Sequence, residues 1–223
     1  MPDASTDPRF GGRPAQPLLI RLSHWINVPL LLLMAGSGLQ ILWAYPALGP
    51  RGAPYWWYPF QGVPPPRWAT FGGWLAGARH WHFALAWFLV LNGLIYLLYL
   101  LASGEWRRRM FVWSRDAGAA VMMLAYYLRM SRQAPASDFY NGLQRLAYSG
   151  VLVLAVAEVL SGLAIYKPLQ LWWLAAIFGG YDGARAVHLS ILALIVCFAI
   201  VHLLLVALHP KTLVQMITGG GRG

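Results

Sequence analysis

The stretch ARAVHLSILALIVCFAIVHLLLVAL, residues 184–208, decides how the rest of the chain is interpreted. It is long and apolar enough to cross a bilayer as one α-helix. His188 and His202 lie fourteen residues apart within it, so both rings leave the same side of that helix, roughly 21 Å apart along its axis. Ionisable side chains at membrane depth are costly and are functional-site candidates by default. One histidine near each end of a span suggests two cofactors stacked across a membrane.

Three further apolar stretches are long enough to span a membrane, at residues 18–43, 79–102 and 143–166. The chain has 223 residues, 59% of them hydrophobic and 11% charged, so little sequence remains for a soluble domain. We expect an all-α, integral membrane four-helix bundle over residues 18–210, between a flexible tail at 1–17 and a second tail at 211–223. The apolar piece 117–128 is too short to cross and predicts an interfacial helix between the second and third spans.

The basic residues are distributed unevenly between the two sides of this predicted bundle. Segments on the side of the termini carry 11 lysines and arginines and the opposite segments carry 5, within a net charge of +10. Because positively charged segments stay in the cytoplasm, both termini are expected to be cytoplasmic. Topology and the headgroups of the lipid bilayer account for this charge, so we expect no nucleic-acid partner.

Span orientation pairs the histidines by depth. Successive spans run in opposite directions, so His24, near the start of the first span, lies at the depth of His202. His80 and His82, near the start of the second span, lie at the depth of His188. We favour His82 as the partner of His188 because it is deeper in its span. His80 is expected to face the interface or a propionate, and His209 to lie at the interface.

Two imidazoles on opposite sides of a flat macrocycle describe a haem with both axial positions filled, which favours electron transfer. Zinc needs further ligands, and the first, second and fourth spans, which carry these histidines, offer no Asp, Glu or Cys at either depth. Copper stays open by counting alone, although the small residues in MAGSG, residues 34–38, suit a large planar cofactor better. The alternative for each histidine is hydrogen bonding between helices. The chain has no C-x-x-C-H motif, so any haem is held without covalent attachment.

Four arginines are placed for the haem propionates, which need basic or hydrogen-bonding company. Arg79 and Arg185 are placed for the outer haem, and Arg21 and Arg145 for the inner one. The alternative for each is snorkelling of the side chain to the lipid headgroups. Glu158, inside the third span, is either a proton-relay carboxyl or a packing residue that stays neutral.

Several motifs together resemble the bacterial cytochrome b561-like group, which includes the di-haem membrane subunits of nickel–iron hydrogenases, formate dehydrogenases and thiosulfate reductases. They are the His188 and His202 pair, RLSHW at residues 21–25, RHWHF at 79–83 and YNGLQRLAY at 140–148. The thiosulfate reductase cytochrome b branch looks most similar. The resemblance implies a multi-pass protein of the bacterial inner membrane with two non-covalent haem b groups. His24 and His202 would ligate the inner haem, and His82 and His188 the outer one.

The same resemblance implies an electron-transfer subunit rather than a catalytic one. It would carry electrons between the quinone pool and a periplasmic or peripheral oxidoreductase of the molybdopterin or hydrogenase type. A quinone site is expected near the inner haem, where Asn141, Gln144 and Arg145 could bind a carbonyl oxygen; the alternative is that they cap and anchor the third span. Two other functions stay open: a stand-alone quinol or superoxide oxidoreductase, and a non-redox membrane anchor. The aromatic runs at 55–59 and 64–68 predict an interfacial belt, a docking surface for a partner, or both.

Overall fold

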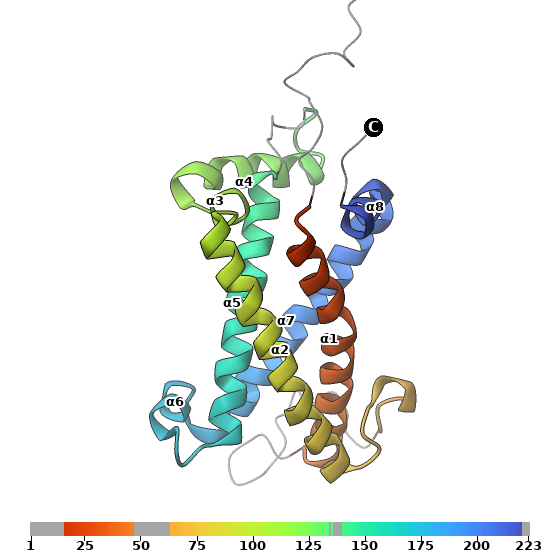
Figure 1. The fold of residues 1–223 in the computed structure, drawn as a ribbon, viewed down its shortest axis with the longest axis vertical. Helices are drawn as coiled ribbons and strands as arrows, with labels where there is room; N and C mark the ends of the chain where they lie inside the picture. Colours follow the sequence, from red (N-terminus) through yellow and green to blue (C-terminus); the bar gives the residue numbers. More distant parts are fainter. Residues whose placement is uncertain (1–15, 47–62, 134, 136–139, 220–223) are drawn as a thin grey trace, which may run out of the picture. The chain divides into compact units, whose positions relative to one another are not determined.

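The computed structural model describes residues 16–46, 63–133, 135 and 140–219, and every regular element in these residues is helical. They form four long helices and several short ones, whose arrangement is drawn in Figure 1. The long helices are α1 (Leu18–Ala44), α2 (Leu75–Ser103), α5 (Gly142–Tyr166) and α7 (Gly180–Leu208). The short ones are η4 (Arg67–Ala69), α3 (Trp106–Arg109), α4 (Trp113–Tyr127), α6 (Trp172–Ile177) and α8 (Pro210–Thr218). The aromatic run at 55–59 lies outside the described residues.

The four long helices are each long and apolar enough to cross a membrane. Only 6% of the most apolar window of α7 is buried inside the protein. Leu203 and Leu208 expose 65% and 73% of their surface. A soluble protein does not expose apolar surface on this scale, whereas a bilayer covers it. The predicted all-α fold with four membrane spans is confirmed, with α2 and α7 each beginning four residues before the predicted start.

The chain divides into two compact units, and each long helix contributes to both. The His24 unit comprises the segments Met1–His24, Tyr96–Gly150 and Ala199–Gly223. The His82 unit comprises Trp25–Ile95 and Val151–Phe198. Each unit therefore holds one of the two histidine pairs that the sequence predicts.

In the His82 unit, small and polar residues bring the helices together. The amide of Asn92 on α2 donates to the Asn27 side-chain oxygen on α1 at 2.8 Å. The Gly36 carbonyl on α1 accepts from the Phe71 backbone N–H at 3.0 Å. A Cβ at Gly36 would stand 3.3 Å from the Ala69 carbonyl oxygen. The loop around η4 therefore approaches α1 closely because this residue has no side chain.

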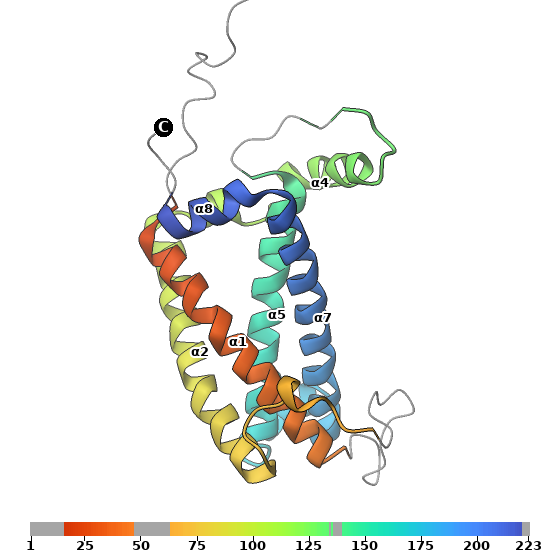
Figure 2. The ribbon, with the colours of Figure 1, turned by 90° about the vertical axis from the view of Figure 1, so that its right-hand side faces the viewer.

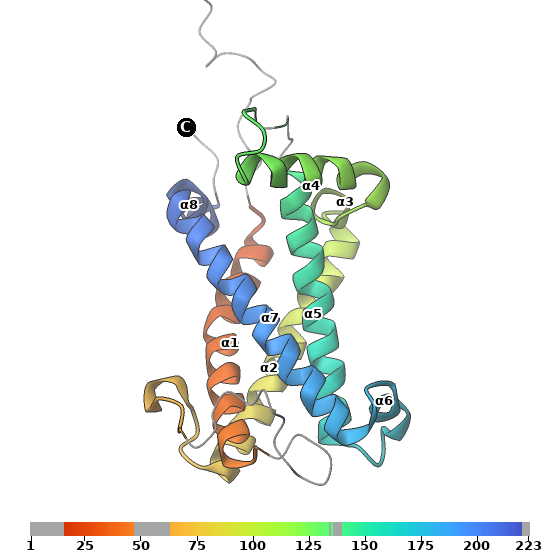
Figure 3. The same ribbon diagram turned by 180° about the vertical axis from the view of Figure 1, so that it is seen from behind.

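The short helix α6 connects α5 to α7 in the same unit (Figure 3). Its residues Leu174 and Ala175 form a buried cluster with Ala164 of α5 and Ala184 of α7. Both of these partner alanines are fully buried. Small side chains at the contact let the helices approach closely, which compensates for the weak hydrophobic drive within a bilayer.

In the His24 unit, α4 crosses the start of α5 (Figure 1). A Cβ at Gly142 would lie 2.6 Å from the Ala120 backbone nitrogen, so only glycine permits this contact. Asp116 of α4 is 1% exposed and accepts hydrogen bonds from Arg115 and Arg145, each at 2.8 Å. The hydrogen bond from Arg115 is the main reason that the pKa of Asp116 lies well below its ordinary value, and the Val112 N–H and Arg145 lower it further. A helix is thus present where one was predicted at 117–128, and it is anchored to α5. Its interfacial position stays a prediction.

A second polar network in this unit is centred on Arg109, which is 5% exposed. Its guanidinium donates to the Glu105 carboxylate at 2.9 Å, to the Tyr140 hydroxyl at 2.7 Å and to the Gln16 side-chain oxygen at 3.0 Å. A buried arginine is tolerated only when its donors are satisfied, as they are here. The network joins Gln16 in the N-terminal segment to α3 and to Tyr140, two residues before α5.

Helix α8 occupies most of the segment that the sequence analysis treated as a tail. It begins at Pro210 and ends at Thr218, and the following Gly219 caps it with a φ of 100°, in the left-handed region. Arg21 of α1 donates to the carbonyl oxygens of Met216 and Ile217 in the last turn of α8. A cation at the C-terminus of a helix satisfies its free carbonyls and its dipole. Figure 2 shows α8 leading from the end of α7 toward the start of α1.

Candidate functional site

The His24 unit brings the rings of His24 on α1 and His202 on α7 close together. Their ring centroids are 6.1 Å apart, and the ring planes are inclined at 65°. Both rings lie in helices that satisfy their own backbone hydrogen bonds, so the side chains are the available polar groups at this depth. In the sequence, all of α2 and α5 lies between these two residues. They are close together because of the way the helices are arranged.

The His82 unit brings His82 of α2 and His188 of α7 together in the same manner. Their ring centroids are 6.3 Å apart, with the planes inclined at 71°. His80 is exposed and its ring lies against Trp81, at a centroid distance of 6.2 Å. Of the two histidines at the start of α2, the structure therefore places His82 opposite His188. The role of each ring as a haem ligand stays a prediction.

These separations fit a metal held between two imidazoles. An imidazole nitrogen binds a transition metal at about 2 Å, so two such bonds in line, with the ring radii added, place the centroids about 6 Å apart. Among the described residues, no group of three or more His, Cys, Asp or Glu side chains could hold a metal ion. Each pair thus offers two ligands on opposite sides, and a metal bound there needs its other ligands from a cofactor such as a porphyrin.

A glycine and a serine lie against each of the His82 and His188 rings. Gly38 of α1 and Gly162 of α5 face the two rings, and a Cβ at these positions would stand 3.5 Å and 3.3 Å from the respective Cε1 atoms. Ser37 Oγ lies 2.9 Å from His82 Nδ1, and Ser161 Oγ lies 3.0 Å from His188 Nδ1. A ligand histidine is ordinarily held at its second nitrogen in this way. The sequence analysis noted the small residues around Ser37 but missed both hydroxyl contacts.

Glu158 of α5 lies beside the same pair. Its Oε1 is 3.3 Å from His188 Nε2. Its Oε2 is buried and has no hydrogen-bond partner among the described residues. The carboxyl is therefore part of this site, at the ring nitrogen opposite the one held by Ser161.

The four predicted propionate arginines each have contacts within the protein. Arg21 binds the α8 carbonyls and Arg145 the Asp116 carboxylate, as described above. Arg185, 9% exposed, donates to the Tyr45 carbonyl at 2.9 Å and lies over the Tyr45 and Tyr181 rings. The Arg79 guanidinium lies 6.0 Å from the Phe83 ring centroid. Their binding to propionates stays a prediction.

Two of the predicted quinone-site residues form a reciprocal cap at the start of α5. The Asn141 side-chain oxygen accepts from the Gln144 N–H at 2.8 Å, and the Gln144 side-chain oxygen accepts from the Asn141 N–H at 3.1 Å. This is the capping-box arrangement of a helix N-terminus. It uses the two side-chain oxygens and leaves the two NH₂ groups as donors.

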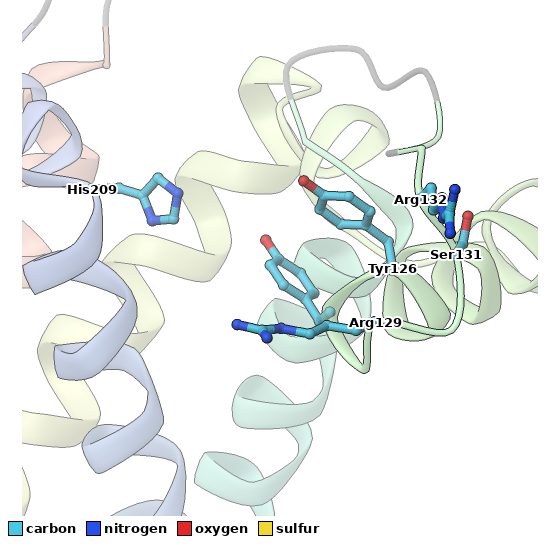
Figure 4. A pocket seen from close by; sticks show the side chains of 6 residues that line it. Tyr126, Arg129, Ser131, Arg132 and His209 are labelled. Carbon is cyan, nitrogen blue, oxygen red and sulfur yellow. The ribbon is translucent and has the colours of Figure 1, made fainter.

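A cavity of about 550 Å³ lies at the end of α4, lined by Tyr126, Tyr127, Arg129, Ser131, Arg132 and His209. Figure 4 shows the Arg129 side chain extending toward the end of α7, where His209 follows. Arg129 has a φ of 59°, which is uncommon for a residue other than glycine. Basic and tyrosine side chains suit the phosphate level of a bilayer. His209 thus lines a surface cavity and belongs to neither of the two histidine pairs.

Comparison with known proteins places this arrangement in a family. The family described as prokaryotic cytochrome b561 matches residues 15–219. A protein of Azospira oryzae named "Putative protein-methionine-sulfoxide reductase subunit YedZ1" is 38% identical over 203 residues, which cover 91% of this chain and 95% of that protein. No solved structure matches. The predicted thiosulfate reductase branch is not the one that this relative's name indicates, and the branch stays a prediction. The chain belongs to the prokaryotic cytochrome b561 family and is a multi-pass membrane protein that binds b-type haem.

Proposed function

We propose that this chain is the di-haem electron-transfer subunit of a membrane oxidoreductase. The observation that carries the proposal is the presence of two opposed histidine pairs, with ring centroids at 6.1 Å and 6.3 Å, one in each unit. A single haem would need one pair only. Two pairs of matching separation on four apolar helices support one haem in each.

In this proposal His24 and His202 hold the inner haem, and His82 and His188 hold the outer one. Bound haem supplies a one-electron redox centre. The two imidazoles of each pair would both hold the iron, which would exclude substrate from it and leave electron transfer as its function. On α7 the two proposed ligands are fourteen residues apart, which is about four turns of helix.

The partner is proposed to be a catalytic oxidoreductase subunit at the outer face. The printed name of the Azospira relative supports a partner that reduces methionine sulfoxide in proteins. Reduction of a sulfoxide to a thioether consumes two electrons and two protons and releases one water. The chain would pass these electrons from a quinol to the partner. More broadly, we propose a partner of the molybdopterin or hydrogenase type.

Quinone exchange is proposed at the inner haem. The NH₂ groups of Asn141 and Gln144 donate to no described residue, so they are available to a quinone carbonyl oxygen. Arg145 is held 2.8 Å from Asp116 and would act by fixing the start of α5. Both termini would be cytoplasmic in the inner membrane, as the excess of basic residues on their side supports.

The test is a reduced-minus-oxidised visible spectrum of the purified chain, with a haem count per polypeptide. Two b-type haems per chain support the proposal. One haem or none contradicts it, and none would leave the non-redox anchor as the function. The partner is tested separately by purifying the chain from membranes, and a catalytic subunit that co-purifies with it supports the complex. Quinol oxidation by the isolated chain, with oxygen as the sole electron acceptor, supports the stand-alone alternative.

A further inference from the structure

Two serine–glycine pairs hold the rings of the His82 unit in the same way. Ser37 on α1 lies 2.9 Å from His82 Nδ1, and Ser161 on α5 lies 3.0 Å from His188 Nδ1. Each serine hydroxyl also donates at 3.0 Å to the carbonyl oxygen three residues earlier in its own helix, at Met34 and at Glu158. The same set of contacts therefore occurs twice, once on α1 and once on α5, with the same spacing between the serine and the carbonyl that it binds.

The two contacts of each hydroxyl fix the direction of the hydrogen bonds. A serine hydroxyl has one proton, and a carbonyl oxygen only accepts. With that proton donated to the carbonyl, the serine oxygen accepts from an Nδ1–H of the histidine. For His188 a second contact gives the same answer, because its Nδ1 also lies 3.1 Å from the Glu158 carbonyl oxygen, which can only accept. Both rings therefore carry their proton on Nδ1 and have the lone pair on Nε2.

The glycine after each serine lies against the ring, and at Gly162 an added Cβ would be a tight contact. A Cβ at Gly38 or Gly162 would meet the Cε1 atom of the facing histidine at 3.5 Å or 3.3 Å. The ring edge thus lies against the helix backbone, with the hydroxyl bound at Nδ1. Ser37 and Ser161 are both fully buried, so water does not compete for these hydrogen bonds.

We propose that Ser37 and Ser161 are positioning residues that fix the tautomer and the ring orientation of both axial histidines of the outer haem. The inference rests on the proposed function, namely that a haem binds between His82 and His188. A hydrogen bond from Nδ1–H makes the imidazole a more basic ligand, which stabilises ferric iron. The two serines together therefore lower the reduction potential of this haem and strengthen its binding.

The experiment uses the purified, haem-loaded full chain and the variants Ser37→Ala and Ser161→Ala. A redox titration followed in the visible spectrum gives both haem potentials, and electron paramagnetic resonance of the ferric state reports the axial ligands. We expect a higher potential and altered g values for the outer haem in each variant. Its haem affinity should fall roughly 10- to 100-fold. The inner haem serves as an internal reference and should not change.

Ser190→Ala is the matched control. Ser190 lies two residues from His188 on α7, but it is exposed and donates at 2.9 Å to the Ala186 carbonyl of its own helix. This variant should keep both potentials. Ser161→Thr keeps a hydroxyl at the critical position and should restore the outer haem signals that Ser161→Ala alters.

Outer-haem potential and g values that do not change in either alanine variant would overturn the inference. Loss of the outer haem alone in Ser161→Ala supports it if Ser161→Thr retains that haem, and overturns it if the threonine variant loses the haem as well. Failure of the proposed function looks different. In that case the unaltered chain would hold fewer than two b-type haems, or His82→Ala and His188→Ala would both retain the outer haem, whatever the serine variants do.

Discussion

Glu158 Oε1 lies 3.3 Å from His188 Nε2, the nitrogen that carries the lone pair in the tautomer set by Ser161. A carboxyl oxygen and an iron cannot both occupy the position in front of this atom. Binding of a haem between His82 and His188 therefore requires the Glu158 side chain to turn away from Nε2. The second carboxyl oxygen has no partner among the described residues that would hold the side chain where it is.

Replacing Glu158 by leucine should retain the outer haem. The change removes a competitor for Nε2 and a buried oxygen without a hydrogen bond, which costs about 1–3 kcal/mol. We expect two haems per chain and tighter haem binding at the outer pair, measured by titrating haem into the apoprotein. A variant that binds only one haem would show instead that the carboxyl helps to hold the outer haem.

The neighbouring histidines of α2 should differ sharply on substitution. His82→Ala removes a ring that faces His188 at 6.3 Å and should lose the outer haem. His80→Ala changes an exposed ring that lies against Trp81 and should keep both haems. Haem counts per chain decide between them, and the reverse pattern would assign the ligand to His80.

His202→Ala should remove the inner haem and leave the outer one. The substitution takes away one side of the pair with His24, whose rings are 6.1 Å apart, and does not alter the His82 unit. The measurement is a low-temperature visible spectrum, in which the α-band of a single haem should remain. If two haems persist with unaltered spectra, the pairing is wrong.

Asp116→Asn should destabilise the His24 unit by about 3 kcal/mol, because it leaves the Arg145 guanidinium without its buried anionic partner. The folded-state pKa of Asp116 is lowered, chiefly by Arg115, so its stabilisation is fully present above the ordinary value of 3.8. That stabilisation is lost as the pH falls below 3.8 toward the folded-state pKa. Thermal unfolding in detergent should show a gap between wild type and variant that narrows on acidification. A gap independent of pH would contradict the ionised state of Asp116.

The sequence was sufficient to predict the long helices and the partners of the histidines. Span length follows from bilayer thickness, and the alternating direction of spans places His24 with His202 and His188 with the start of α2. Depth alone favoured His82 over His80, and the structure supplies the physical reason: the Ser37 hydroxyl and the space at Gly38 receive the His82 ring.

Side-chain partners were harder to predict because they depend on which faces of the helices meet. Ser37 and Ser161 are ordinary small residues in their own helices, and their contacts with histidines exist only after α1 packs on α2 and α5 on α7. Arg21 and Arg145 reach carbonyls of α8 and a carboxylate of α4, which are distant in sequence. Helix α8 had a usable signal, since Pro210 suits a first helical turn and the apolar residues Leu213, Val214 and Ile217 share one face.

The two serine contacts also differ in one respect, namely the side chain three residues before each serine. Met34 and Glu158 occupy the same place relative to Ser37 and Ser161, three residues earlier in the helix, and each offers its carbonyl to the hydroxyl. The Glu158 side chain adds an acid beside His188, whereas the residue in the corresponding position, Met34, has an uncharged thioether. Two imidazoles held by the same hydrogen bonds would therefore give the two faces of a macrocycle unequal electrostatic environments. The difference would come from one residue, Glu158, and not from the ligands themselves.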